Sequence, residues 1–140
     1  MNIALDMMGG DYAPLETIKG VQLFLSENKD DVTITLIGDE NKLNPLLKEY
    51  SIITEKINVV HASEVIEMQE HPTKALKEKQ QSSISIGFHL LAASRTDAFI
   101  SAGNTGAMMV GALYSIKAIT GVARPAIGAY IPRDDGKLSL

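Results

Sequence analysis

Short apolar runs alternate along the chain with longer segments that repeat apolar residues at helical spacing. Runs rich in β-branched and small apolar residues predict strands at 2–6, 32–38, 57–61, 97–101 and 125–131. The segments between them predict helices at 14–26, 40–50, 73–80, 82–94 and 103–119. Asp135-Gly136 indicates a hairpin turn into a returning strand at 138–140. This alternation predicts an α/β fold with a mostly parallel sheet covered on both faces, and one domain over residues 1–140.

The composition of the chain argues against several classes of function. Of the 140 residues, 45% are hydrophobic and 21% charged, which is typical of a globular domain. The net charge of −4 and the lack of a dense basic stripe argue against nucleic-acid binding. The chain has no cysteine, so disulfides, thiolate catalysis and Cys-ligated metals are excluded within it. No apolar run reaches the length of a membrane span, and the first residues lack the features of a signal peptide.

The segment Ser101-Ala102-Gly103-Asn104-Thr105-Gly106-Ala107 lies between a predicted strand and a predicted helix. Its small residues allow a ligand to approach the backbone, and the first turn of a helix offers unpaired N–H groups to an anion. Asn104 or Thr105 can cap the helix, and the Thr105 hydroxyl can bind an anion. The segment is neither a Walker P-loop nor a GxGxxG motif, so a plain turn remains an alternative to a phosphate site.

A second glycine-rich loop, Asp6-Met7-Met8-Gly9-Gly10-Asp11, follows the first predicted strand. In parallel sheets, ligands bind at the carboxyl ends of strands, so the two loops form one cleft if their strands are neighbours. Asp6 and Asp11 can orient a donor, act as a base or hold a metal. The alternative is that Asp6 binds loop N–H groups and that Asp11 caps the next helix.

The remaining polar residues carry weaker signals. Lys74, Lys77 and Lys79 follow Pro72, and they predict either a docking patch for an acidic partner or a solvated helix face. The three histidines, His61, His71 and His89, have no metal-ligand spacing, so no metal site is expected. Arg124 is a candidate anion ligand or a surface ion-pair partner.

Taken together, the motifs resemble the bacterial acyl-ACP:phosphate acyltransferase family, the fatty acid/phospholipid synthesis proteins. The resemblance covers essentially the whole chain. It depends on the order and spacing of 6–14, 36–39, 101–107, Arg124-Pro125-Ala126 and Asp135-Gly136-Lys137.

The resemblance implies a three-layer α/β/α sandwich related to isocitrate and isopropylmalate dehydrogenases and to phosphotransacetylases. It implies transfer of an acyl group from acyl carrier protein to inorganic phosphate, without a cofactor, for phospholipid synthesis. It further implies a cytoplasmic homodimer that contacts the membrane peripherally through a C-terminal part. Family members are about twice this length or more, so we expect the chain to be an N-terminal portion.

Under this hypothesis each motif receives a role. We expect Asp6 and Asn104 to be catalytic. We expect the phosphate and the acyl group to be bound by the two loops, through Gly9, Gly10, Asp11, Ser101, Gly103, Asn104, Thr105 and Gly106. Docking of the carrier protein would involve Lys74, Lys77 and Lys79, although this segment is less basic than is usual in the family.

Two other functions remain open. One is a phosphotransacetylase-like enzyme that uses acyl-CoA, and the other is a non-catalytic phosphate-binding α/β domain. A decarboxylating dehydrogenase is not favoured, because the sequence has neither clustered metal-binding aspartates nor a dinucleotide motif.

Overall fold

The computed structural model describes residues 1–27, 31–52, 55–123, 125–129, 131–132 and 138–139. A four-stranded parallel sheet with the order β3-β2-β1-β4 organises the fold. Its strands are β1 (Asn2–Asp6), β2 (Thr33–Gly38), β3 (Ile57–His61) and β4 (Ala98–Ile100). The first four predicted strands are therefore confirmed, and β1 lies at the centre of the sheet, directly beside β4.

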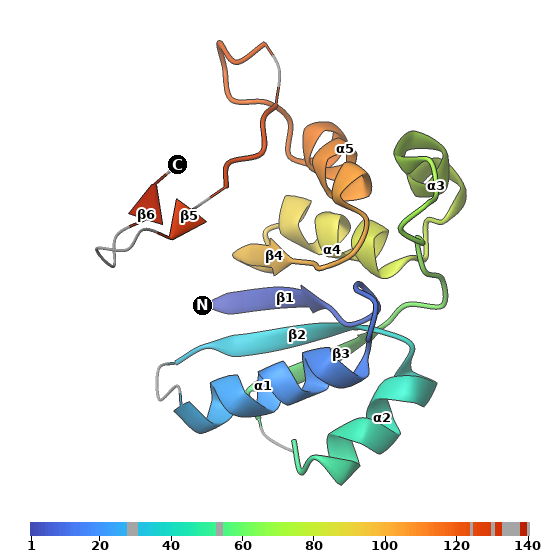
Figure 1. Ribbon diagram of the computed structural model, residues 1–140, viewed down its shortest axis with the longest axis vertical. Coiled ribbons are helices and arrows are strands. Elements are labelled where there is room, and N and C mark those ends of the chain that lie inside the picture. Colours follow the sequence, from blue (N-terminus) through green and yellow to red (C-terminus); the bar gives the residue numbers. More distant parts are fainter. Residues whose placement is uncertain (28–30, 53–54, 124, 130, 133–137, 140) are drawn as a thin grey trace.

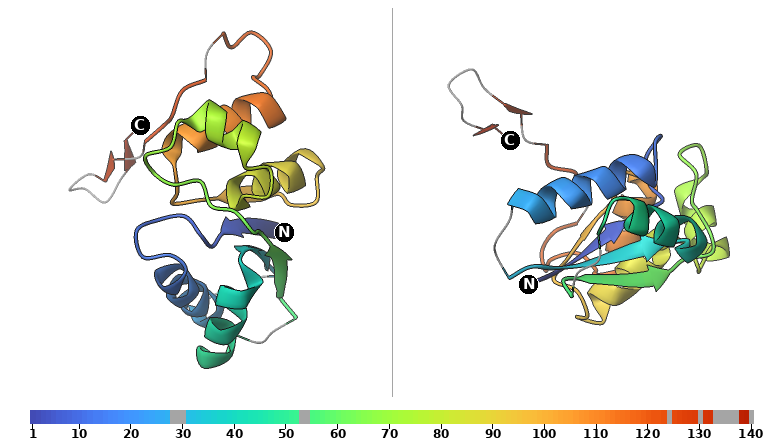
Figure 2. Two further views of the ribbon diagram at one scale, coloured as in Figure 1. Left: turned by 90° about the vertical axis from the view of Figure 1, so that its right-hand side faces the viewer. Right: turned by 90° about the horizontal axis from the view of Figure 1, so that it is seen from below.

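The described residues form five helices around this sheet, in a layered α/β arrangement (Figure 1). Helices α1 and α2 lie on one face of the sheet, and α4 lies on the other, with α3 and α5 beside it (Figure 2). No helix among the described residues is both long and apolar enough to cross a membrane. The helices are α1 (Leu15–Glu27), α2 (Glu40–Glu49), α3 (Pro72–Glu78), α4 (Ser83–Ala92) and α5 (Thr105–Ser115).

Successive side chains along a strand point to opposite faces of the sheet, so the hydrophobic core has a part on each face. Leu36 of β2 is fully buried in a cluster with Ile18 of α1 and Leu43 of α2. Ile37, the next residue of β2, is buried on the opposite face with Leu90 of α4. Burial of both faces explains why the strands read as continuous apolar runs, as is usual for parallel sheets.

Three helices begin where the sequence places a capping side chain. Asp39 accepts a hydrogen bond from the Asn41 N–H at the start of α2, and Ser82 accepts one from the Ser85 N–H at the start of α4. At the start of α5, Asn104 accepts from the N–H of Ala107. The caps fix the point at which each loop becomes a helix, and the cap of α5 confirms one of the two predicted candidates.

The C-terminal part differs from the prediction. Helix α5 ends at Ser115 rather than near Ile119, because Lys117 adopts a left-handed conformation with φ = 70°. The strand predicted at 125–131 is wrong over 125–129, which have no strand partner among the described residues. Two short strands, β5 (Ile131–Pro132) and β6 (Leu138–Ser139), pair in an antiparallel manner. Arg124 and the Asp135-Gly136-Lys137 turn lie outside the described residues.

Two helical glycines predict opposite effects of adding a methyl group. A Cβ at Gly87 in α4 would lie 2.3 Å from the ring of Phe99, which packs edge-to-face on Phe88. Gly87→Ala should therefore lower the free energy of unfolding by about 1–3 kcal/mol through overpacking. A Cβ at Gly20 in α1 would meet nothing within 4 Å, so Gly20→Ala should raise it by about 0.5–1 kcal/mol. Urea denaturation measures both, and a Gly87→Ala chain as stable as the wild type would contradict this packing.

Candidate active site

The sheet register brings the ends of two loops together. Leu5 of β1 is the register partner of Ile100 of β4, so the next residues, Asp6 and Ser101, lie side by side at the carboxyl ends of their strands. The Ser101 hydroxyl donates to Asp6 Oδ2 at 2.7 Å, and the Met8 N–H donates to Asp6 Oδ1 at 2.9 Å. The Ser101 oxygen also accepts from the Gly103 N–H at 2.9 Å. One buried carboxylate, exposed by only 2%, thus links both loops.

The glycines of the two loops allow their backbones to touch. A Cβ at Gly9 would lie 2.6 Å from both Asp6 Oδ2 and the Gly103 nitrogen. Gly10 has φ = 101°, a conformation that side chains rarely adopt, and it lies against Ala102. The sequence left open whether the two strands are neighbours; the sheet order places β1 beside β4, and the two loops are in contact.

Asn104 has a buried side chain with all of its polar atoms engaged. Its Nδ2 group donates to the backbone carbonyls of Glu67, Met68 and Glu70 at 3.0, 3.2 and 3.1 Å, and its Oδ1 accepts from Ala107. An amide group has two hydrogens, so the three carbonyls share them. The side chain is 4% exposed, and it ties the start of α5 to the segment 65–70.

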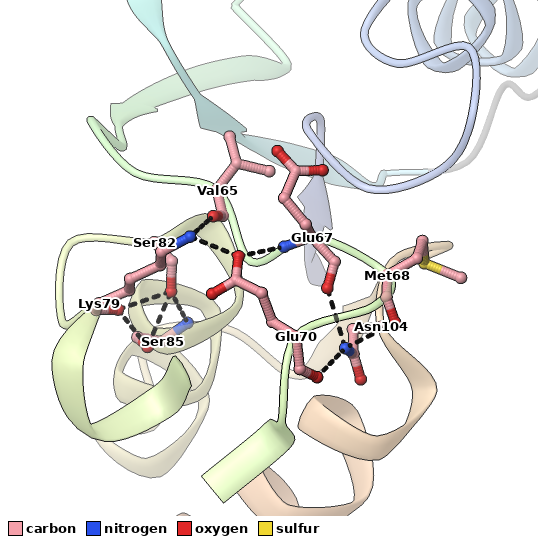
Figure 3. Close-up of polar contacts among 8 residues, drawn as sticks. All are labelled: Val65, Glu67, Met68, Glu70, Lys79, Ser82, Ser85 and Asn104. Carbon is pink, nitrogen blue, oxygen red and sulfur yellow. Dashed lines mark hydrogen bonds and ion pairs between the residues drawn. The ribbon is translucent and has the colours of Figure 1, made fainter. Parts of the chain in front are cut away.

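We call residues 65–70 the strap, which leads into α3 (Figure 3). On the side opposite Asn104, Lys79 Nζ donates to the Val65 carbonyl at 2.7 Å and forms an ion pair with the Glu70 carboxylate. The same carboxylate oxygen accepts from the Glu67 N–H at 2.9 Å. These two hydrogen bonds hold the pKa of Glu70 below its ordinary value, with the bond from Lys79 as the larger cause.

The atoms that remain available to a ligand belong to the backbone and to a few small side chains. Among the described residues, the N–H groups of Thr105 and Gly106 have no acceptor. The side chains of Asp11 and Thr105 are exposed. Gly106 is partly exposed and packs against Pro72, which a Cβ at Gly106 would meet at 2.5 Å. The available donors therefore cluster at the first turn of α5, beside the 7–14 loop.

The three lysines predicted as one patch are separated by the fold. Lys74 and Lys77 are exposed on α3, whereas Lys79 points inward to the strap. Lys77 lies on the border of a groove of about 820 Å³ between α3, α4 and α5. Among the described residues, no group of three or more His, Asp or Glu side chains is arranged to hold a metal ion.

The strap was not predicted from the sequence. Its residues lie between the strand predicted at 57–61 and the helix predicted at 73–80, and nothing in their types signals a contact with Asn104 some 34–37 positions further along the chain. The local signal at this end of the strap is Pro72, which stands in the first turn of α3 and marks where that helix begins.

Comparisons with known proteins give a consistent result. The family model described as "Fatty acid synthesis protein" matches residues 1–140. The phosphate acyltransferase of Dictyoglomus turgidum is 48% identical over 132 residues, which is 94% of this chain and 39% of that protein. Those of Acetivibrio thermocellus and Geobacillus thermodenitrificans are 47% and 43% identical over 137 residues, which is 98% of this chain and 40% of each relative. The chain thus spans about two fifths of the length of these relatives.

The link between the loops predicts a strong effect of Asp6→Asn. Asparagine keeps one acceptor oxygen, but its amide nitrogen cannot accept a hydrogen bond. Either the Ser101 hydroxyl or the Met8 N–H therefore loses its acceptor, and the free energy of unfolding should fall by about 1–3 kcal/mol. Asp39→Asn is the matched control, because asparagine caps a helix as well as aspartate does and stability should hardly change. Equal stabilities of the two variants in urea denaturation would show that the link contributes little.

The lowered pKa of Glu70 predicts a pH-dependent contribution to stability. A carboxylate with a depressed pKa in the folded state stabilises fully above its ordinary pKa, and this contribution is lost as the pH falls through the folded pKa. The stability difference between the wild type and Glu70→Gln should therefore be largest near neutral pH and shrink between about pH 5 and pH 3. Urea denaturation at several pH values measures it, with the exposed Glu78→Gln as control. A difference that stays constant down to pH 3 would exclude this ion pair as its source.

Proposed function

The chain belongs to the fatty acid synthesis protein family, and from this premise we propose that it carries the phosphate-binding part of a phosphate acyltransferase site. The proposed reaction converts an acyl thioester of acyl carrier protein and inorganic phosphate into acyl phosphate and free carrier. The main support is the junction of the two glycine-rich loops at the start of α5, where the N–H groups of Thr105 and Gly106 have no acceptor among the described residues. The names of the relatives agree with this chemistry.

The first turn of α5 suits a phosphate. The N–H groups of Thr105 and Gly106 lie at the positive end of the helix dipole, and the exposed Thr105 hydroxyl adds a third donor. In the proposed arrangement, the partly exposed Gly10 lets the thioester approach the backbone, whereas Gly9 is buried against Gly103, and N–H groups of the 7–14 loop face the developing oxyanion.

The reaction needs positioning more than it needs a reactive side chain. An oxygen of hydrogen phosphate attacks the thioester carbonyl carbon and forms a tetrahedral intermediate. The C–S bond then breaks, and the proton of hydrogen phosphate ends on the departing thiol, so atoms and charges balance. Because phosphate is itself the nucleophile, two ordered loops that hold both reactants supply the main catalytic effect.

We assign Asp6 and Asn104 to the placement of the two loops rather than to contact with substrate. Both side chains are buried, and the polar atoms of each already bond to protein groups. Ser101 and Gly103 belong to the same linkage, whereas Gly10, Asp11, Thr105 and Gly106 remain at the surface. The substrate-binding role therefore falls on the second group.

The carrier protein is the proposed macromolecular partner. Lys74 and Lys77 are exposed and have no ion-pair partner among the described residues, so they are available to an acidic surface. The groove beside Lys77 adds apolar contacts from Leu76 and Phe88.

The motif resemblance further supports a dehydrogenase-like sandwich, a homodimer, and a cytoplasmic protein with peripheral membrane contact.

An activity assay tests the proposal directly. The chain is incubated with palmitoyl carrier protein and phosphate, and acyl phosphate is trapped with hydroxylamine; the Dictyoglomus turgidum enzyme serves as the positive control. Turnover by the chain would place the chemistry within its residues. Turnover by the control alone, together with phosphate binding by the chain in titration calorimetry, would leave the chain as the phosphate-binding part. A chain that neither turns over nor binds phosphate would refute the proposal, and preference for palmitoyl-CoA would favour the phosphotransacetylase-like alternative.

The phosphate site predicts a selective effect of Thr105→Val. This change removes one exposed hydroxyl at nearly constant volume, and loss of a hydrogen bond to a charged ligand should weaken phosphate binding by about tenfold or more. Gly106→Val should weaken it as well, through crowding against Pro72. Thr73→Val, in the first turn of α3, is the matched control and should leave the dissociation constant unchanged. If phosphate binds all four proteins equally in titration calorimetry, the site is elsewhere.

A further inference from the structure

The strap is held from two opposite sides, and the two attachments meet at Glu70 (Figure 3). From one side, Lys79 contacts the Val65 carbonyl and the Glu70 carboxylate. From the other, Asn104 donates to the strap carbonyls, including that of Glu70 itself. The carboxylate of one residue therefore binds Lys79 while its carbonyl binds Asn104.

Lys79 is fixed at its backbone as well as at its amine. It is the C-cap of α3, and its N–H donates to the Ala75 carbonyl at 2.8 Å. Its own carbonyl accepts from the hydroxyls of Ser82 and Ser85 at 2.8 and 2.9 Å, at the start of α4. A lysine anchored at both ends offers the strap a support whose position is set by α3 and α4.

The same contacts connect Lys79 to the start of α5. Asn104 binds the strap through Nδ2 and caps α5 through Oδ1, so the orientation of its amide depends on where the strap carbonyls lie. Removing the Lys79 charge would leave the partly buried Glu70 carboxylate without its cation, and the carboxylate would turn toward water. The strap carbonyls would then move relative to Asn104, which is adjacent to Thr105.

We infer that Lys79 is a positioning residue for the phosphate site, acting through Glu70 and Asn104. This inference rests on the function proposed above. It gives Lys79 a role different from that of Lys77, which lies two positions earlier on α3, is exposed and has no ion-pair partner among the described residues. The two lysines therefore form a matched pair for experiment.

Phosphate titration of the chain separates positioning from general stability. Lys79→Met should weaken phosphate binding at least fivefold, and Lys79→Arg, which keeps the charge, should stay within about twofold of the wild type. Lys77→Met should bind phosphate like the wild type, because Lys77 is exposed and its proposed contact is with the carrier protein rather than with phosphate. Gly87→Ala, destabilised in α4 by its clash with Phe99, should also bind like the wild type at a temperature where every variant is folded. The inference is overturned if Lys79→Met binds normally, or if Gly87→Ala loses as much affinity.

Hydrogen exchange of the Ala107 amide gives a readout independent of phosphate. This amide donates to Asn104 Oδ1, so its protection should fall in Lys79→Met and persist in Lys77→Met. A wild-type chain that binds no phosphate would refute the proposed function. The exchange data would then still test whether Lys79 influences the start of α5. Unchanged protection of Ala107 in Lys79→Met would refute that connection even if phosphate binds.

Discussion

The contact between the β1 and β4 loops is the constraint on which the site depends. Parallel pairing places Asp6 beside Ser101, and their hydrogen bond closes only because Gly9 and Gly103 let two backbones approach without side chains between them. A methyl group at Gly9 would collide with both the carboxylate and the facing backbone nitrogen. The strand order thus decides which loops meet, and the glycines decide how closely.

The two side chains expected from the sequence to be catalytic have structural contacts instead. Asp6 and Asn104 are buried, and the hydrogen bonds of Asn104 hold the strap in place. Among the described residues at the junction, Asp11, Tyr12 and Thr105 are exposed, and the N–H groups of Thr105 and Gly106 have no acceptor. A main-chain site selects an oxyanion by the direction of its N–H groups, which agrees with a chain that has a net charge of −4 and no dense basic stripe.

Local patterns predicted the fold well, because strands and caps depend on neighbouring residues. The β-branched run that forms β2 and the caps Ser82 and Asn104 were readable from a few adjacent positions. Sequence reasoning also predicted that the two glycine-rich loops would meet if β1 and β4 were neighbours, but the strand order itself was not readable. It failed at 125–129, where apolar residues have no strand partner, and at Lys79, whose partners lie 9 and 14 positions earlier in the chain. From spacing alone, the three lysines were grouped as one surface patch. In the structure, Lys79 is the C-cap of α3 and its side chain points to the strap, away from Lys77.

The charge of Asp6 also bears on the proposed phosphate site. The Gly103 N–H donates to Ser101, which donates to Asp6, so these donors point inward to a carboxylate rather than outward to a ligand. A buried negative charge near the turn opposes anion binding, and in the described part of the chain the α5 N–H groups and the Thr105 hydroxyl offset it. The arrangement therefore favours modest phosphate affinity. Modest affinity would suit the proposed reaction, in which phosphate is held and then released as part of a product, better than it would suit a domain whose sole task is to retain phosphate.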